Sequence, residues 1–390
     1  MKAVGLIVEY NPFHNGHKLH LQKAKEISNA DISIAIMSGN FLQRGEPALL
    51  NKWLRARMAI ENGVDIVIEL PSFYSNQSAE IFAEGAVKIA DRLLCDSIVF
   101  GSEENDINKL IKLAQIQLDK NNSFHTLVKE KLEKGLSYPN SLALAYEELY
   151  NEKNILNPNN ILGIEYIKAL KKINSSTKAL NICREKVGYF QKDTVDKIAS
   201  ATGIRQMLRN KDYEKVKEVV PEATYDILMN NLAKLSQLKD FYPLIRFSLI
   251  KDKDKLQNIQ DMEEGLWNRL YDCAKKNTDF DAFIKDLSNP RYTQSRINRV
   301  LSHILLGIET NEVEEARKNL PYIRVLAYNE VGAKYMKYLK KEFNINFIIS
   351  LKNAERIVEN KNFLDKELDR DSIYKMQYPY EDEAFAILKK

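Results

Sequence analysis

The chain has 390 residues, of which 44% are hydrophobic and 29% are charged, and its net charge is only +4. A chain of this length exceeds one ordinary hydrophobic core, so we expect at least two domains. The small net charge excludes an overall cationic field as the means of binding nucleic acid. Any such binding must come from a local basic patch.

Cysteine usage and hydropathy indicate where the protein works. The three cysteines, Cys95, Cys183 and Cys273, are far apart and form no CxxC pair, which argues against a disulfide framework or a zinc site. The apolar run at the N-terminus is too short for a secretory signal, and no span approaches membrane length. We therefore expect a cytoplasmic protein that has no membrane partner.

The first half of the chain alternates between two kinds of apolar pattern. Short runs rich in Val and Ile predict buried strands, and segments with a helical period follow each of them. Parallel strands need crossover connections, so this alternation predicts an α/β fold with a parallel sheet covered on both faces. The predicted strands are 2–9, 31–39, 64–71, 96–103 and 178–184, and the predicted helices are 16–28, 51–62, 79–93, 105–120, 124–134, 141–150, 157–172 and 200–210.

The pattern changes near residue 210. Residues 211–310 are expected to be almost entirely helical, with breaks at KDKDK and LSNPRY. Residues 322–328 and 346–350 then predict two strands that flank a lysine-rich helix. We therefore divide the chain into an α/β domain over 1–210 and a mainly helical domain over 211–390.

The stretch NPFHNGHKLH, residues 11–20, holds three of the five histidines and follows the first predicted strand. Ligands of open α/β sheets bind beyond the carboxyl ends of the strands, and helix N-termini favour phosphate. His14 and His17 are three residues apart at a helix start, so both rings can donate hydrogen bonds to one phosphate. Gly16 permits close approach of the backbone. His20 lies one turn further on and is equally consistent with a supporting role.

A second polar segment, SATGIR, covers residues 200–205. Ser200 and Thr202 offer hydroxyl groups at a helix start, Gly203 permits close approach, and Arg205 supplies a planar cationic fork. Such helix caps are common, and the segment gains meaning only together with HNGH. Gly101, at the end of the strand 96–103, is expected at the same sheet edge, where a flat base can lie against the backbone.

Five segments carry a family resemblance, in one order along most of the chain. They read GLIVEYNPFHNGHKLH, SGNFLQRGEPALLNKWLRARMAIENGVDIVIELP, FGSE, NPNNILGIEYIKAL and SATGIR. HNGH resembles the HxGH signature of the nucleotidyltransferase superfamily related to class I aminoacyl-tRNA synthetases. The whole set resembles the bacterial tRNA(Met) cytidine acetate ligase family. Asn11 departs from the pattern, because many superfamily members carry Asp before the loop proline.

The resemblance implies a Rossmann-like nucleotidyltransferase domain of the HIGH type, followed by a mainly α-helical tRNA-binding domain. It implies that ATP, with Mg²⁺, activates acetate as acetyl-adenylate. The wobble cytidine in the anticodon region of elongator tRNA(Met) then becomes N4-acetylcytidine. The implied catalytic residues are His14 and His17. The implied ATP-binding residues are Ile7, Val8, Glu9, Tyr10, Asn11, Pro12, Phe13, His14, Asn15, Gly16, His17, Lys18, Leu19, His20, Gly101, Asn159, Asn160, Arg184, Ser200, Thr202 and Arg205.

Two of these positions stay ambiguous at this stage, because either Asn159 or Asn160 can make the nucleotide contact and Asn159 can equally be a helix cap. The loop and helix over 39–59 also allow two interpretations. As a basic loop with an aromatic residue over a nucleotide site, it can receive the second substrate through Gln43, Arg44, Glu46, Lys52, Trp53 and Arg57. Equally, Arg55 and Arg57 can form the solvated face of a surface helix.

The segment 289–303 is the strongest candidate for an RNA surface. Arg291, Tyr292, Arg296, Arg299 and His303 fall within thirteen residues that contain no acid. The last three recur at helical spacing, which predicts one basic face, and Tyr292 can stack on an unpaired base. A solvated helix face is the alternative interpretation. Weaker candidates for phosphate contact are Lys334, Lys337, Lys340 and Lys341.

Two other functions are compatible with parts of the sequence. A small-molecule adenylyltransferase of the HxGH superfamily shares the first domain but leaves the basic segment 289–303 without a function. A non-catalytic RNA-binding module on a nucleotide-binding fold explains the basic segment but leaves the histidine pair unexplained. The ligase accounts for both features.

Overall fold

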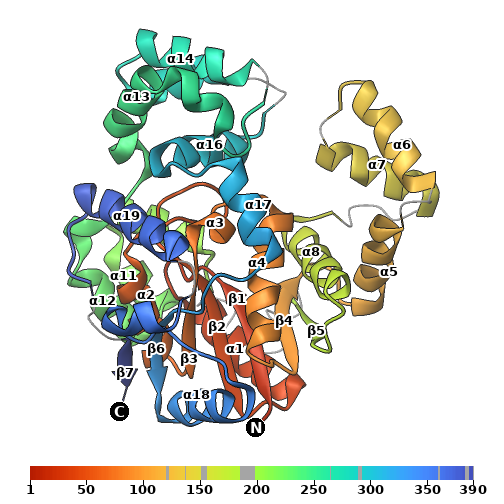
Figure 1. Ribbon diagram of the computed structural model, residues 1–390, viewed down its shortest axis with the longest axis vertical. Coiled ribbons are helices and arrows are strands. Elements are labelled where there is room, and N and C mark those ends of the chain that lie inside the picture. The colour runs from red at the N-terminus through yellow and green to blue at the C-terminus, as the bar shows by residue number, and fades with distance from the viewer. Residues whose placement is uncertain are drawn as a thin grey trace.

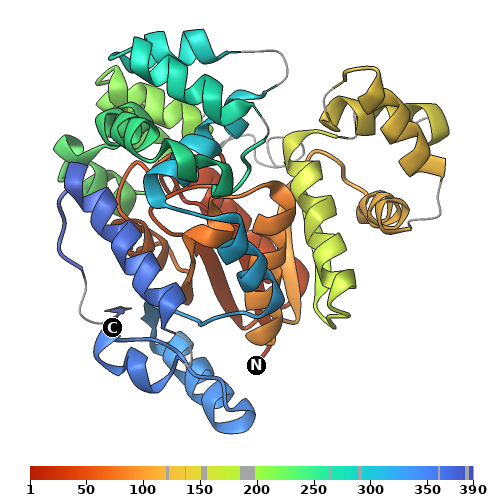
Figure 2. The same cartoon turned by 45° about the horizontal axis from the view of Figure 1, so that its top comes forward.

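Figures 1 and 2 show a computed structural model of the protein. It describes residues 1–119, 123–136, 138–150, 156–184, 198–263, 265–288, 292–358, 361–382 and 386–389. A central sheet is flanked by helices on both faces. One helical group lies beyond one end of the strands, and a second projects to one side.

The sheet has seven strands in the order β5-β4-β1-β2-β3-β6-β7. Strands β1 to β5 pair in parallel, β6 pairs antiparallel with β3, and β7 pairs parallel with β6. The chain moves outward from β1 through β2 to β3 and then returns to β4 on the other side of β1. The strand order therefore reverses between β1 and β4, where open α/β sheets bind ligands. The strands are β1 (Ala3–Val8), β2 (Ile32–Ser38), β3 (Ile66–Leu70), β4 (Ser97–Ser102), β5 (Lys178–Cys183), β6 (Val325–Asn329) and β7 (Ile387–Lys389).

Alternate residues of each central strand enter two separate cores. In β2, Ile34 and Ile36 pack into one core, whereas Ala35 and Met37 pack into the other. This alternation follows from the period of two in a strand and explains why the strands have nearly continuous apolar sequences. One face is covered by α1 (Asn15–Ser28), α2 (Lys52–Glu61), α10 (Ala201–Arg209), α11 (Tyr213–Val219) and α12 (Glu222–Met229).

The other face carries α3 (Ser72–Ser75), α4 (Ala79–Arg92) and α8 (Pro158–Lys172), and its core continues into the remaining helices. The projecting group consists of α5 (Ile107–Leu118), α6 (Ser123–Glu133) and α7 (Tyr138–Tyr150). The group beyond the strand ends contains α13 (Tyr242–Lys251), α14 (Leu266–Lys276), α15 (Phe280–Leu287) and α16 (Gln294–Leu306), followed by α17 (Thr310–Lys318) (Figure 1). Among the described residues, no helix is both long and apolar enough to cross a membrane.

The predicted α/β fold is confirmed, including all five strands before residue 210. The prediction for 346–350 is wrong as a regular strand, because Ile348 forms only an isolated bridge with Arg324. Strand β6, predicted within 322–328, instead joins the central sheet beside β3. The division at residue 210 stays a prediction, although the sheet extends beyond it through β6 and β7.

The predicted lysine-rich helix is α18 (Glu330–Phe343), and it lies at the amino-terminal edge of the sheet. Gly332 packs on the carbonyl oxygen of Asp65, which immediately precedes β3. Figure 1 places α18 near the N-terminus, at the opposite end of the strands from α16. The exposed Lys334, Lys337, Lys340 and Lys341 therefore lie far from the ligand-binding edge of the sheet.

The structure contradicts the solvated-face interpretation of Arg55, and Lys52, a candidate for contact with the second substrate, does not line the cavity at the carboxyl edge of the sheet. Both side chains are fully buried, whereas Arg57 is exposed. The Arg55 guanidinium donates hydrogen bonds to the carbonyl oxygens of Leu50 at 3.0 Å, Glu9 at 2.7 Å and Ser38 at 3.0 Å, and also to that of Gly39. The carbonyls of Glu9, Ser38 and Gly39 lie at the ends of β1 and β2, so one cation satisfies both strand ends.

Arg55→Met should destabilise the protein by at least about 3 kcal/mol, because it leaves several buried carbonyl oxygens without a donor. The free energy of unfolding, measured by urea denaturation, tests this value. Arg57→Met on the same helix is the matched control and should change it by less than about 0.5 kcal/mol. Equal effects of the two substitutions would contradict the role assigned to Arg55.

Candidate active site

A cavity of about 1040 Å³ opens at the carboxyl edge of the sheet, between β1 and β4. Its wall includes the end of β1, the start of α1, Gly101 on β4, the start of α10 and the first turns of α16. The cavity thus lies where the strand order reverses. His14 and Arg299, which are nearly 300 residues apart in sequence, both line this cavity.

His14 and His17 form a stacked pair at the N-terminus of α1. Their ring centroids are 3.6 Å apart, with an angle of 23° between the planes. The Nδ1 atom of His14 accepts a hydrogen bond from the backbone N–H of His17, and the Nδ1 atom of His17 accepts one from the backbone N–H of His14, both at 3.3 Å. This reciprocal arrangement is a capping box made from two histidines.

The capping bonds determine which nitrogen carries the proton. Because each Nδ1 accepts a hydrogen bond, each neutral ring has its proton on Nε2 and can donate from that atom. Burial, with a smaller effect of Arg184, lowers the pKa of His14 to about 4. Burial and the neighbouring His14 and His20 lower the pKa of His17 further. At neutral pH the pair therefore offers two uncharged donors at the positive end of a helix.

Gly16 and His20 complete this end of α1. A Cβ atom on Gly16 would lie 2.9 Å from the His14 ring, so glycine is required for the stacked pair as well as for backbone approach. His20 also lines the cavity, and burial lowers its pKa to about 4, with Arg184 as a weaker cause. Its Nε2 is buried without a hydrogen-bond partner among the described residues. His20 is thus placed at the site itself.

The second predicted segment closes on the first through Arg205. Ser200 caps α10 by accepting a hydrogen bond from the backbone N–H of Gly203 at 3.1 Å. Arg205 donates to the hydroxyl oxygen of Thr202 at 3.2 Å and to the carbonyl oxygen of Asn11 at 3.1 Å. Ser200, Thr202 and Arg205 all line the cavity. The structure therefore brings the two polar segments together at one cavity.

Asn11 stands where many superfamily members carry Asp, and its side chain bonds to the protein backbone. Its side-chain oxygen accepts a hydrogen bond from the backbone N–H of Leu49 at 2.7 Å. This bond ties the HNGH loop to the segment before α2. The side chain is buried and contributes to loop structure rather than to the cavity wall.

The geometry separates Asn159 from Asn160. Asn160 is buried, and its side-chain oxygen accepts hydrogen bonds from the backbone N–H groups of Glu103 at 2.9 Å and Glu104 at 3.0 Å. Asn159 lines the cavity, and its side-chain oxygen lies 3.5 Å from Arg184. The cap of α8 is Asn157, so Asn159 is not the helix cap.

Fourteen of the residues implied as ATP-binding line the cavity: Ile7, Val8, Glu9, His14, Gly16, His17, Leu19, His20, Gly101, Asn159, Arg184, Ser200, Thr202 and Arg205. The others support the wall from behind or face away: Tyr10, Asn11, Pro12, Phe13, Asn15, Lys18 and Asn160. Tyr10 and Phe13 are buried and place their ring centroids 5.0 and 5.7 Å from that of His17. They fix the orientation of that imidazole.

The predicted basic segment reaches the site in an unexpected way. Thr293, Ser295 and Arg299 line the cavity, whereas Arg291 lies outside the described residues. Sequence patterns do not indicate that Thr293 and Ser295 belong to the site, because only the packing of α16 brings them there. Ser302 donates a hydrogen bond to the carbonyl oxygen of Gly45 at 2.6 Å and holds α16 against the loop that precedes α2.

The expected basic face of α16 is wrong in part. His303 is fully buried, with its ring nitrogens 2.9 and 2.6 Å from the carbonyl oxygens of Gln260 and Asn76. Arg296 pairs with Glu263 at 2.6 Å and lies over the ring of Tyr292. Arg299 pairs with Asp261 at 3.1 Å. Acids from the loop before α14 therefore neutralise part of the charge that the segment shows in isolation.

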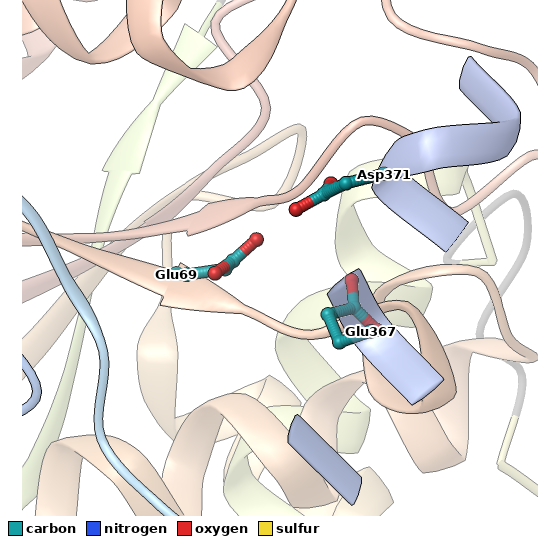
Figure 3. A group of neighbouring side chains, drawn as sticks. All are labelled: Glu69, Glu367 and Asp371. Atoms are coloured by element: carbon teal, nitrogen blue, oxygen red, sulfur yellow. The ribbon is translucent and has the colours of Figure 1, made fainter. Parts of the chain in front are cut away.

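A separate acidic group, Glu69, Glu367 and Asp371, lies behind the site and is drawn in Figure 3. The three side chains come from β3 and α19 (Asn362–Gln377) and are buried. Lys52 places its Nζ atom 2.5 Å from both Glu69 and Asp371, and Arg324 lies 3.2 Å from Glu69. Because protein cations already neutralise the carboxylates, the group joins α2, β3 and α19 and is a poor metal site.

Comparison with known proteins agrees with this geometry. A model of the HIGH Nucleotidyl Transferase family matches residues 1–386. A tRNA(Met) cytidine acetate ligase from Fusobacterium nucleatum subsp. nucleatum is 43% identical over 400 residues, covering 100% of this chain and 99% of the relative. The ligase from Caldanaerobacter subterraneus subsp. tengcongensis is 40% identical and covers 100% and 98%. A crystal structure of Thermotoga maritima TmcAL bound with alpha-thio ATP is similar at a TM-score of 0.89 and 31% identity, over 100% of both chains.

Acid should destabilise the protein through His14. The ordinary pKa of 6.5 applies to the unfolded chain, whereas the folded value is about 4, so the unfolded chain binds the proton first. The stability that the neutral ring contributes is present above about pH 7 and is lost as the pH falls towards 4. Through His14 alone, the free energy of unfolding should fall by roughly 3 kcal/mol between about pH 7 and pH 4.

His14→Asn should remove that part of the pH dependence, measured by urea denaturation at several pH values between about 7 and 5. The exposed His125→Asn serves as the control and should leave the curve unchanged. A His14→Asn curve parallel to that of the wild type would show that His14 titrates normally in the folded state.

Proposed function

Because this chain belongs to the HIGH nucleotidyl transferase family, and within it to the tRNA(Met) cytidine acetate ligases, we propose that it uses ATP to attach acetate to the wobble cytidine of elongator tRNA(Met). The observation that carries this proposal is the stacked, neutral His14–His17 pair at the start of α1. It lies in a cavity that also contains the SATGIR hydroxyls and Arg205. We further propose that the enzyme acts in the cytoplasm, where tRNA is modified.

The first half-reaction activates the acid. An acetate oxygen attacks the α-phosphorus of ATP, the bond to the β-phosphate oxygen breaks, and pyrophosphate leaves with that electron pair. The Nε2–H groups of His14 and His17, together with the helix N-terminus, stabilise the charge that builds up on the α-phosphate. Neutral donors suit this task because they do not trap the product adenylate as a strong ion pair.

The leaving pyrophosphate requires positive charge and hydroxyl donors. Arg205 is held by Asn11 and Thr202 in an orientation that faces the cavity, and Ser200 lies one turn before it. We assign these groups to the β- and γ-phosphates. The Mg²⁺ that we propose enters with ATP, bound by the oxygens of the triphosphate.

The second half-reaction requires a base of the tRNA to enter the cavity. The first turns of α16 form one wall, through Thr293, Ser295 and Arg299. The adjacent Tyr292 and Arg296 lie close together, with the guanidinium 5.4 Å from the ring centroid. This arrangement supports a role for α16 in guiding an extruded cytidine of the anticodon loop to the adenylate, since arginine binds phosphate and tyrosine stacks on bases.

Incubation with ATP, labelled acetate and bacterial tRNA should transfer label to the RNA, and mass spectrometry of the nucleosides should identify N4-acetylcytidine. His14→Asn should lower the rate of acetate-dependent pyrophosphate exchange by about 10²-fold, because it removes a donor to the reacting phosphate. Label transfer without ATP would contradict the adenylate mechanism. A dinucleotide product made from a phosphorylated metabolite would favour the small-molecule adenylyltransferase instead.

Arg296→Ala should raise the dissociation constant for tRNA about fivefold and reduce the slope of log K against log salt by roughly one phosphate contact. Filter binding at several salt concentrations measures both quantities. Pyrophosphate exchange should stay unchanged, because Arg296 is not part of the cavity wall. The control is Arg92→Ala, an exposed arginine at the end of α4. Equal tRNA binding by both variants would remove Arg296 from the proposed interface.

A further inference from the structure

The carboxylate of Glu9 has a defined place in the cavity wall. Glu9 is the first residue after β1 and lines the same cavity as the histidine pair. Its Oε1 accepts a hydrogen bond from the backbone N–H of Gln43 at 2.9 Å, and Arg55 binds its carbonyl oxygen at 2.7 Å. Gln43 therefore holds the side chain of Glu9, and Arg55 holds its backbone. Within the described parts of the chain, the second carboxylate oxygen has no hydrogen-bond or ion-pair partner.

Glu9 lies on the side of the cavity from which α16 approaches. Gln43, which binds its carboxylate, is two residues before Gly45, and a Cβ atom on Gly45 would lie 2.1 Å from the backbone nitrogen of Arg299. The loop that orients Glu9 is thus in direct contact with the helix proposed to guide the tRNA. The carboxylate therefore lies in the same cavity wall as the histidines and is held by the loop that contacts α16.

The transfer of acetyl to cytidine requires a base. The exocyclic amine of cytosine is a weak nucleophile, because its lone pair is delocalised into the ring. When N4 attacks the acetyl carbon, the new C–N bond forms, the bond between that carbon and the phosphate oxygen breaks, and AMP leaves with the electron pair. One N4 proton must then be lost to give the neutral amide, so a proton acceptor within hydrogen-bond reach speeds the step.

The histidines that line the cavity do not serve well as this acceptor. In His14 and His17 the Nδ1 atoms already accept backbone hydrogen bonds, so each ring is a donor from Nε2. Burial lowers the pKa of His20 to about 4 but raises that of the Glu9 carboxyl above its ordinary 4.5, so Glu9 binds a proton more strongly than His20 does.

The other cavity carboxylates are already paired. Glu165 lies 2.8 Å from Lys168, and Glu80 lies 2.7 Å from Lys172. Of the three carboxylates that line the cavity in the described structure, Glu9 is the one that no lysine or arginine holds in an ion pair.

The charges around Glu9 favour proton acceptance. Burial raises the pKa of its carboxyl group, while Arg55, Arg205 and Arg44 oppose that rise. Tyr166, from α8, lines the same cavity, and its pKa is raised by burial and, to a smaller extent, by Glu9. The net direction increases the affinity of Glu9 for a proton relative to an exposed glutamate.

We propose that Glu9 is the general base of the second half-reaction, accepting the N4 proton of the target cytidine through its free carboxylate oxygen. The proton then passes to solvent when the acetylated tRNA leaves. The proposal rests on the proposed ligase function, and it assigns to Glu9 a role that differs from nucleotide binding.

The two half-reactions can be measured separately. Adenylate formation is followed by acetate-dependent pyrophosphate exchange, and transfer by single-turnover acetylation of tRNA from added acetyl-adenylate. Glu9→Gln keeps an oxygen that accepts the Gln43 N–H but removes the base. Because Glu9 also lines the ATP cavity, the informative quantity is the ratio of the two losses, and we expect transfer to fall at least about 10²-fold more than exchange does. Glu26→Gln, on the exposed side of α1, is the matched control and should change neither rate.

The outcomes separate this proposal from the ligase function itself. A wild-type protein that acetylates no tRNA contradicts the ligase function. A wild type that is active, with Glu9→Gln transferring acetyl at the same rate, overturns the role of Glu9 alone. Equal losses in exchange and transfer also overturn it, since they indicate a nucleotide-binding role.

Glu9→Asp covers the case in which Glu9→Gln does not fold. It keeps a carboxylate, so single-turnover transfer should still rise with pH to a plateau, with a midpoint shifted from that of the wild type. Exchange should not follow the same profile. An Asp variant whose transfer rate has the wild-type midpoint overturns the proposal.

Discussion

The carboxyl edge of the sheet depends on the buried guanidinium of Arg55. Parallel strands that end together leave carbonyl oxygens pointing into the space where a ligand must bind, and water cannot reach all of them. Arg55 satisfies the carbonyls of Leu50, Glu9, Ser38 and Gly39 from a helix packed on one face. The ends of β1 and β2 thereby keep a defined shape without help from the substrate. The position of Glu9 and the path of the HNGH loop follow from this arrangement.

The chemistry of the site follows from how two histidines share one helix end. Reciprocal capping bonds fix both rings, and burial keeps both uncharged. Positive charge is instead supplied by Arg205 on α10, which contacts the first loop through the carbonyl oxygen of Asn11. In the proposed mechanism the uncharged donors serve the α-phosphate and the cation serves the leaving group, an arrangement suited to breaking the bond between them.

The C-terminal part of the chain completes the first domain as well as extending beyond it. Strand β6 continues the sheet, and Asp371 of α19 meets Lys52 of α2 in a fully buried ion pair. Lys52 also binds Glu69 on β3, so one ammonium group connects three elements. Replacing one member of such a group leaves an uncompensated buried charge, which is why these elements are expected to unfold together.

The sequence by itself determined the five strands before residue 210, the helices between them, the HNGH and SATGIR segments and the family. These features depend on local periodicity, on residue types at helix ends and on motif spacing. Only the tertiary structure decided which polar residues face the cavity. Arg55 and Lys52 look like surface charges in a helical pattern, yet buried carbonyls and carboxylates draw them inside. Asn159 and Asn160 are adjacent and have identical side chains. Their roles differ only because the loop after β4 bonds to Asn160 and leaves Asn159 at the cavity. Thr293 and Ser295 carry no signal at all, because their role depends on a contact between α16 and a loop some 250 residues away, and no local pattern encodes such a contact.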